Sequence, residues 1–255
     1  MTAHVPYGYQ TVSPSEKRRL VLGHFQAIAR RYDLADTLLS GGLHFFWRRR
    51  VMRRLRLGPG DHVLDLCGGT ADFAVLAAQD VGPTGLVVVC DISPAMMAVG
   101  QRKAQRAGVE QRIHWVQGDA ERMGFSDQSF DAVIVGYGVR NFVSLESGMR
   151  EILRVMCSGG RFLAMEFSIP RSPWLRRLYH LYSFHVLPRA GGLITGTEAP
   201  FRYLAESIRV FPAPGRFQAL LMECGFRGSS FELLSNGLAV LYSAARPSRG
   251  AAPER

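Results

Sequence analysis

The chain has 255 residues, of which 47% are hydrophobic and 20% charged, and its formal net charge is +10. This composition is that of a globular protein and excludes a wholly disordered, collagen-like or coiled-coil chain. The longest apolar runs fall far short of the roughly 20 residues that span a bilayer, and no secretory leader is recognisable. We therefore expect one globular domain in the cytoplasm. The four cysteines show no Cys-x-x-Cys spacing, so neither a metal site nor a disulfide framework is expected.

Positive charge is concentrated near the ends of the chain. Residues 1–60 carry 11 Lys and Arg against 3 Asp and Glu, whereas residues 61–170 carry 9 against 13. The densest basic stretch, residues 43–57, has an apolar residue at every fourth position with arginines on its other faces, which predicts an amphipathic helix. Its arginines suit an anionic membrane surface, simple exposure to water, or RNA phosphates. No interleaved aromatic and glycine signature accompanies them, so no nucleic-acid partner is expected.

Residues 1–15 contain turn-forming residues without periodicity, which predicts a flexible arm. A single domain is expected over residues 16–246, and it begins with helices in residues 16–57. From residue 61 onward short apolar strands alternate with amphipathic helices, which predicts an α/β fold whose mostly parallel sheet is covered by helices on both faces. The expected elements are strands 62–66, 86–90, 113–116, 132–135 and 161–166, with helices 71–79, 94–107 and 145–156 between them.

After Pro170 the alternation stops for about forty residues rich in aromatic side chains and arginine. So long a stretch without a strand predicts an insertion, residues 170–214, that acts as a lid or binds substrate. A helix at 216–224 and two strands at 231–234 and 238–243 then complete a seven-stranded sheet. The tail, residues 247–255, is expected to be disordered.

Acidic residues and glycines mark the ends of the first three predicted strands. The first strand ends in Asp65 and runs into the loop Gly68-Gly69-Thr70, Asp91 ends the second strand, and Asp119 follows the third. The loop lacks the G-x-G-x-x-G pattern that receives a pyrophosphate, and its carboxylates would repel one. An acid at the end of the second strand suits ribose hydroxyls. The set favours S-adenosylmethionine over a dinucleotide, although single members such as Asp91 also suit helix capping.

The chain resembles the ubiquinone/menaquinone biosynthesis C-methyltransferases, a family of enzymes that methylate a ring carbon of a polyprenylated quinol. The likeness runs from about Phe25 to Tyr242. Its motifs are Arg31-Tyr32-Asp33, Leu39-Ser40-Gly41-Gly42-Leu43-His44, Trp47-Arg48, Asp65-Leu66-Cys67-Gly68-Gly69-Thr70, Gly118-Asp119-Ala120, Gly138-Val139-Arg140-Asn141, Glu166-Phe167-Ser168-Ile169-Pro170, Tyr182-Ser183-Phe184, Leu187-Pro188, Tyr203-Leu204-Ala205-Glu206-Ser207-Ile208 and Phe211-Pro212. The resemblance implies the Rossmann-like fold of class I methyltransferases.

The resemblance and the strand ends together give three groups of candidate site residues. The expected cofactor-binding residues are Asp65, Gly68, Gly69, Thr70, Asp91, Ile92, Asp119, Ala120 and Gly136. The expected catalytic residues are Arg140, Asn141, Glu166 and Tyr182. The expected substrate-binding residues are Tyr32, His44, Phe167, Phe184 and Tyr203.

The catalytic group has alternative interpretations. Arg140 could stabilise a developing phenolate or hold a water that takes its proton, but it could equally close an ion pair. Glu166 is a candidate base or a residue that orients its neighbours. Tyr32 and His44 could close over the site or serve as core and cap residues.

The sequence departs from the family's pattern at three places. Ala71 stands where a glycine is usual, Gly136 replaces a side chain that often contacts the cofactor, and Pro214 follows Pro212 where a polar residue is common. None removes a candidate catalytic group.

The expected activity is methylation of a prenylated quinol, with demethylmenaquinol preferred to a benzoquinol. Another aromatic or lipid-like acceptor, or a non-catalytic module that binds cofactor or lipid, remains the alternative. Contact with an anionic membrane at its inner face and a homodimer are further expectations.

Overall fold

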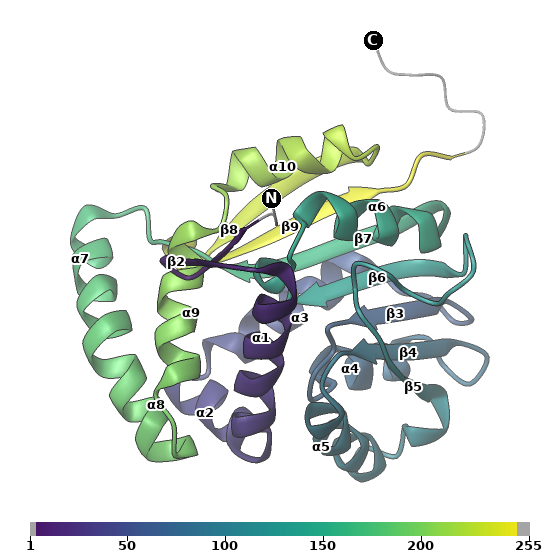
Figure 1. Cartoon of the computed structure of the whole chain (residues 1–255). Helices are drawn as coiled ribbons and strands as arrows, with labels where there is room; N and C mark the ends of the chain where they lie inside the picture. Colours follow the sequence, from purple (N-terminus) through teal and green to yellow (C-terminus); the bar gives the residue numbers. More distant parts are fainter. Residues whose placement is uncertain (1–3, 249–255) are drawn as a thin grey trace.

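The computed structural model describes residues 4–248, and its centre is a seven-stranded sheet (Figure 1). In spatial order the strands are β5 (Ile113–Gln117), β4 (Leu86–Asp91), β3 (His62–Leu66), β6 (Phe130–Gly136), β7 (Met156–Phe167), β9 (Ala239–Ala245) and β8 (Arg227–Leu234). The first five run parallel, and β9 lies antiparallel between β7 and β8. The predicted α/β fold with a mostly parallel, seven-stranded sheet is confirmed.

Helices cover both faces of the sheet because successive strand residues point to opposite sides. In β3, Val63 belongs to one apolar cluster and Leu64 to the other. The first cluster lies under α3 (Leu43–Leu55), α4 (Asp72–Asp80) and α5 (Pro94–Arg106), and the second lies under α6 (Leu145–Val155) and α10 (Pro214–Glu223). Burial on both faces explains why these strands are continuous apolar runs.

Two of the helices begin at serine caps close to the carboxyl ends of strands. The Ser93 hydroxyl accepts a hydrogen bond from the Met96 N–H at 3.4 Å, and Pro94 fills the first position of α5. Ser144 caps α6 in the same way. The cap at Ser93 fixes the turn that follows Asp91 and therefore holds that carboxylate in place.

The N-terminal segment differs from the prediction of a flexible arm. Strands β1 (Val5–Tyr7) and β2 (Gln10–Val12) form an antiparallel hairpin that leads into α1 (Pro14–Ile28). The Tyr7 ring stacks on Tyr203 with centroids 4.6 Å apart, and the Tyr9 N–H donates to Glu206 at 3.2 Å. These contacts lie far apart in sequence, so the local pattern did not reveal them. Residues 1–3 of the arm and 249–255 of the predicted tail lie outside the described residues.

The regular elements of the predicted insertion are all helical. Its elements are α7 (Pro173–Leu181), the π-helical turn η4 (Tyr182–Val186), α8 (Leu187–Thr195) and α9 (Ala199–Val210). Helix α8 packs against α2 (Tyr32–Leu39), and the group lies beside α1 at one end of the sheet (Figure 1). Within residues 4–248 no helix combines the length and the apolar character needed to cross a membrane.

Candidate functional site

A cavity lies at the carboxyl ends of β3, β4 and β6, where open α/β sheets bind ligands. It is lined by all nine residues expected to bind the cofactor: Asp65, Gly68, Gly69, Thr70, Asp91, Ile92, Asp119, Ala120 and Gly136. We call it the cofactor cavity. The structure thus brings the whole predicted group together.

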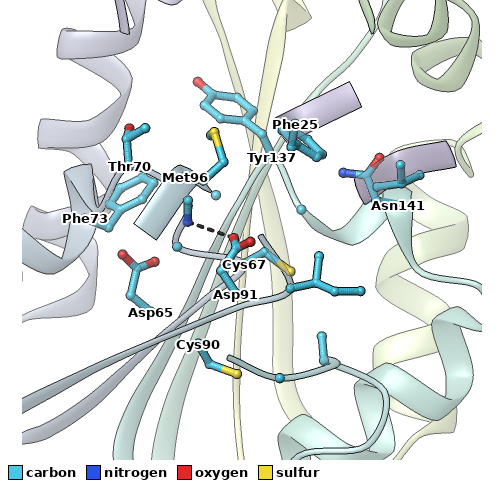
Figure 2. A pocket seen from close by; sticks show the side chains of 18 of the residues that line it. Phe25, Asp65, Cys67, Thr70, Phe73, Cys90, Asp91, Met96, Tyr137 and Asn141 are labelled. Atoms are coloured by element: carbon cyan, nitrogen blue, oxygen red, sulfur yellow. Dashed lines mark hydrogen bonds between the residues drawn. The ribbon is translucent and has the colours of Figure 1, made fainter. Parts of the chain in front are cut away.

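Asp91 lines this cavity, and backbone N–H groups hold its carboxylate; Figure 2 shows the bond from Gly69. Its Oδ2 accepts from the Gly69 N–H at 2.9 Å and its Oδ1 from the Ser93 N–H at 2.7 Å. Burial raises the pKa of Asp91, although the backbone N–H groups act in the opposite direction. Each oxygen keeps a second lone pair, so the fixed carboxylate can accept hydrogen bonds from a pair of ligand hydroxyls.

Asp65 carries an unsatisfied acceptor on the wall of the same cavity. Its Oδ2 accepts from the Ala74 N–H at 2.9 Å, whereas Oδ1 is buried without a partner. Burial raises the pKa of Asp65 to about 8. A cationic ligand group nearby would satisfy the free oxygen and favour the ionised form.

The glycine loop lets the backbone approach a ligand closely. Gly69 has φ +53°, and a Cβ there would lie 3.3 Å from Met96 Cε. Together the backbone space, the Asp91 carboxylate and the free oxygen of Asp65 fit S-adenosylmethionine, which carries ribose hydroxyls and a cationic amino acid end. Among the described residues no cluster of His, Cys, Asp and Glu has the grouping of a metal site.

Helix α1 covers the cofactor cavity, to whose lining it contributes Arg18, Val21 and Phe25. Arg18 Nε donates to Asp119 Oδ2 at 2.9 Å, and Lys17 Nζ donates to the Phe142 carbonyl at 2.6 Å. Asp119 is therefore paired with a residue of α1.

A second, larger cavity of about 530 Å³ adjoins the first, and we call it the apolar cavity. Its walls come from α1, α2 and the insertion, and include Leu39, Leu178, Leu187 and Phe201. Phe25 and Tyr32 line both cavities. The predicted substrate residues Tyr32, Phe167 and Tyr203 line the apolar cavity, which can hold a ring and a hydrocarbon chain beside the cofactor.

Arg140 lines the apolar cavity, and hydrogen bonds to Glu166 and to a backbone carbonyl fix its guanidinium. Its Nη1 donates to Glu166 Oε2 at 2.8 Å and to the Tyr137 carbonyl, and its backbone N–H donates to Glu166 Oε1 at 3.1 Å. Arg140 Nε is buried without a partner. Glu166 is buried and lines neither cavity. Glu166 therefore orients Arg140 and does not reach the space where a substrate would lie.

Asn141 and Tyr203 connect the two cavities. The Tyr203 hydroxyl donates to Asn141 Oδ1 at 3.1 Å, while Asn141 lines the cofactor cavity and Tyr203 the apolar one. Burial raises the pKa of Tyr203 above its ordinary range, so this hydroxyl stays protonated.

Three predicted site residues have contacts other than those expected of a catalytic or substrate-binding residue. The Tyr182 hydroxyl donates to the Leu39 carbonyl at 2.6 Å, so it ties the insertion to α2 although its ring lines the apolar cavity. His44 and Phe184 line neither cavity. His44 is buried and shares a 2.7 Å hydrogen bond with Ser40, and the Arg209 guanidinium lies 4.3 Å from the centre of the Phe184 ring. Both side chains therefore pack against residues of neighbouring helical segments and do not contact either cavity.

A buried ion cluster between the cavities was not predicted from the sequence. Arg48 Nη2 lies 2.7 Å from Asp36 Oδ2 and 2.8 Å from Asp72 Oδ2. The expectation that the arginines of residues 43–57 all face water, lipid or phosphate is wrong for Arg48, which is 8% exposed. The position of Arg48 in the helix could have indicated its burial, because it lies four residues from His44 and Met52, which are both buried.

The fold, the glycine loop and the acid that ends β4 define an S-adenosylmethionine-dependent methyltransferase of class I. Solved structures of similar fold include an S-adenosylmethionine-dependent methyltransferase from Aquifex aeolicus, with a TM-score of 0.57 and 12% identity over 92% of this chain and 98% of that one. Phosphoethanolamine N-methyltransferase 2 of Haemonchus contortus, solved with S-adenosyl-L-methionine, has a TM-score of 0.58 and 14% identity over 79% of this chain and 52% of that one.

The chain belongs to the ubiE/COQ5 methyltransferase family, whose pattern matches residues 11–246. The ubiquinone/menaquinone biosynthesis C-methyltransferase UbiE of Ectopseudomonas mendocina is 40% identical over 241 residues, which cover 94% of each chain. The protein of the same name from Bradyrhizobium diazoefficiens is 40% identical over 93% of this chain and 95% of its own.

Proposed function

We propose that this methyltransferase transfers the methyl group of S-adenosylmethionine to a ring carbon of a polyprenylated quinol in ubiquinone or menaquinone biosynthesis. The observation that carries the proposal is the junction of the two cavities at Phe25 and Tyr32. A quinol ring at this junction lies next to the cofactor, and its prenyl tail extends through the apolar cavity. The relatives named above are quinone-pathway C-methyltransferases, which agrees with this use of the cavities.

The cofactor, when bound, supplies a methyl group on a cationic sulfur. The chain's own residues align the ring with it and exclude water. Arg140, held by Glu166, stabilises the negative charge that grows on the substrate oxygen. The Tyr203 hydroxyl and Asn141 fix the edge of the ring between the cavities.

The test is the mass of the quinone made in cells. Deletion of the gene should leave a quinone one methyl group lighter, and a plasmid copy should restore the normal mass. We propose demethylmenaquinol as the preferred ring, and the accumulated species identifies the ring because naphthoquinones and benzoquinones differ in mass. An unchanged quinone profile would rule out the proposed function.

We further propose that the protein meets its substrate at the inner face of an anionic membrane. Four residues that line the apolar cavity are exposed at its mouth: Leu43, Leu178, Leu181 and Val186. Trp174 is exposed on α7, and Arg177 and Arg189 are exposed near them. Exposed apolar side chains beside basic ones are typical of surfaces that rest on anionic lipid.

The expected homodimer also stays a proposal, and sedimentation velocity of the purified protein tests it.

A further inference from the structure

We propose that the Asp36 carboxylate accepts the proton of the substrate hydroxyl, an inference that rests on the quinol methylation proposed above. Ring carbons of a quinol become nucleophilic when a ring hydroxyl loses its proton, so the enzyme needs a proton acceptor beside the ring. The geometry that points to Asp36 is its place in the wall of the apolar cavity, one helical turn from Tyr32, which lines both cavities.

Asp36 is the sole carboxylate among the described residues that line the apolar cavity. It lies one helical turn after Tyr32, which lines both cavities, so the two side chains share a face of α2. Its Oδ2 lies 2.7 Å from Arg48 Nη2, and Arg48 lines the cofactor cavity. The carboxylate is thus fixed at the place where the ring and the methyl donor must meet.

Other candidate bases are less well placed. Both oxygens of Glu166 are bonded to Arg140, and its side chain is 1% exposed behind that residue. His24 also lines the apolar cavity, but its Nε2 is bonded to the Tyr7 hydroxyl. Neither can reach a ring hydroxyl at the junction without breaking these contacts.

The charges around Asp36 leave it able to exchange a proton near neutral pH. Burial raises the pKa of Asp36 to about 6, while Arg48 acts in the opposite direction. A base with such a pKa is mostly ionised at pH 7 and still accepts a proton readily. The groups that face it from the surrounding elements are Arg48 of α3, Asp72 of α4, Asp33 and Tyr32 of α2, Lys103 of α5 and Tyr137 after β6.

The proton and electrons balance as follows. The hydroxyl proton moves to an Asp36 oxygen, and its bonding pair stays on the substrate oxygen as a phenolate beside Arg140. The ring carbon then forms a bond to the methyl carbon as the methyl–sulfur bond breaks, with the electron pair left on sulfur. The ring carbon loses its hydrogen as a proton to water, and Asp36 returns its proton to the oxygen, which restores the aromatic quinol.

The test compares the pH profile of kcat for the full-length wild type and Asp36→Asn, with 2-farnesyl-1,4-naphthoquinol as substrate. The amide oxygen of the variant can still accept from Arg48, but it cannot take a proton. We expect kcat to fall about 100-fold or more, with loss of the acid limb that we expect for the wild type near pH 6. The dissociation constant for S-adenosylhomocysteine should stay within about twofold because binding there does not require the base. The matched control is Asp80→Asn, an exposed aspartate at the end of α4, which should keep both rate and profile.

A second variant separates proton transfer from positioning. Asp36→Ala leaves space for a small carboxylate, and added formate should restore part of its kcat but not that of a Tyr203→Phe enzyme. An active Asp36→Asn enzyme with an intact acid limb would overturn this inference alone. A wild type that does not methylate the quinol would overturn the proposed function, and the inference with it.

Discussion

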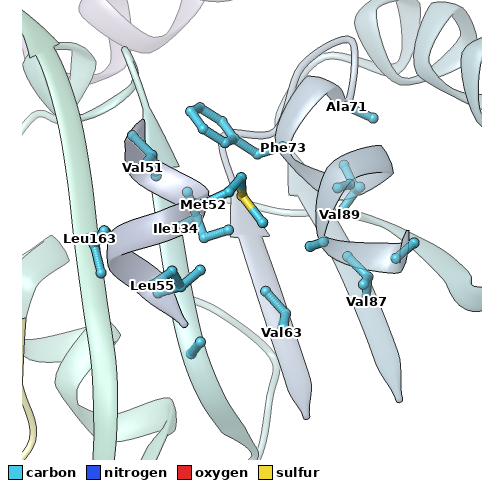
Figure 3. Packing of buried hydrophobic residues seen from close by; sticks show 14 of the residues in the cluster. Val51, Met52, Leu55, Val63, Ala71, Phe73, Val87, Val89, Ile134 and Leu163 are labelled. Atoms are coloured by element: carbon cyan, nitrogen blue, oxygen red, sulfur yellow. The ribbon is translucent and has the colours of Figure 1, made fainter. Parts of the chain in front are cut away.

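The glycine at position 136 shows how one residue depends on a distant neighbour. A Cβ at this position would lie 2.4 Å from Phe73 Cε2 of α4, so only glycine fits while that ring stays in place. Phe73 and Gly136 line the same cavity, and Phe73 with Ala71 belongs to the apolar cluster under α3 and α4 (Figure 3). The aromatic ring therefore fills the space that a side chain at position 136 would need.

Asp91 is the residue on which cofactor affinity should depend most directly. Replacing it in Asp91→Ala removes the acceptor for ribose hydroxyls and leaves the Gly69 and Ser93 N–H groups unpaired. We expect S-adenosylmethionine binding to weaken by about 1–3 kcal/mol, measured by isothermal titration calorimetry. Asp80→Ala serves as the charge control. Equal affinity of Asp91→Ala and wild type would exclude the ribose role.

Binding of the cofactor should change the protonation state of Asp65. With a pKa of about 8 the carboxyl is mostly protonated at pH 7 in the free protein. The cationic amino group of the ligand lowers this pKa, so binding at pH 7 should release up to about one proton. Calorimetry in buffers of different ionisation enthalpy measures the release. Asp65→Asn should bind without it, and proton uptake by the wild type would contradict the assignment.

At the scale of elements, helix α1 is attached to the rest of the domain through a buried lysine, whose Nζ donates to the Phe142 carbonyl. Lys17 is 5% exposed, and burial lowers its pKa to about 8. The unfolded chain, with an ordinary lysine pKa, binds the proton more tightly than the folded one. The charged lysine therefore costs stability below pH 8, and this cost disappears as pH rises from about 8 toward 10.5.

Comparison with Lys17→Met isolates this effect. The free energy of unfolding of the wild type, relative to the variant, should increase between pH 8 and 10.5, as measured by urea denaturation at each pH. A constant difference across this range would show that the lysine is not buried as a cation. Other groups that titrate there cancel because both proteins contain them.

The strands were more predictable than the helical insertion. Strands such as β4 are apolar runs bounded by glycine and aspartate, and that local pattern is enough to place their ends and the acid at the carboxyl end. In the insertion, α7 exposes Trp174, Leu178 and Leu181 as well as its arginines, so apolar residues do not mark a buried face there as they do in an ordinary surface helix. The Asp36–Arg48 pair was not predictable because two separate helices bring its charges together.

At the scale of the whole molecule, the apolar mouth and the basic ends predict a salt-dependent membrane association. The protein should sediment with phosphatidylglycerol vesicles at low salt and be released at high salt. Leu178→Glu, at the mouth, should weaken this sedimentation, whereas Met222→Glu, exposed on α10, should not. Equal recovery of the protein on neutral and anionic vesicles would contradict a contribution of its basic residues to membrane binding.

The shared wall formed by Phe25 and Tyr32 makes the two cavities thermodynamically dependent on each other. A molecule in either cavity holds these rings still and so prepares the surface that the other molecule must meet. The affinities are then linked, and each occupant should strengthen the binding of the other by the same factor. Such reciprocity would hold the spent nucleoside and the methylated lipid together until one of them departs, after which the other leaves more easily.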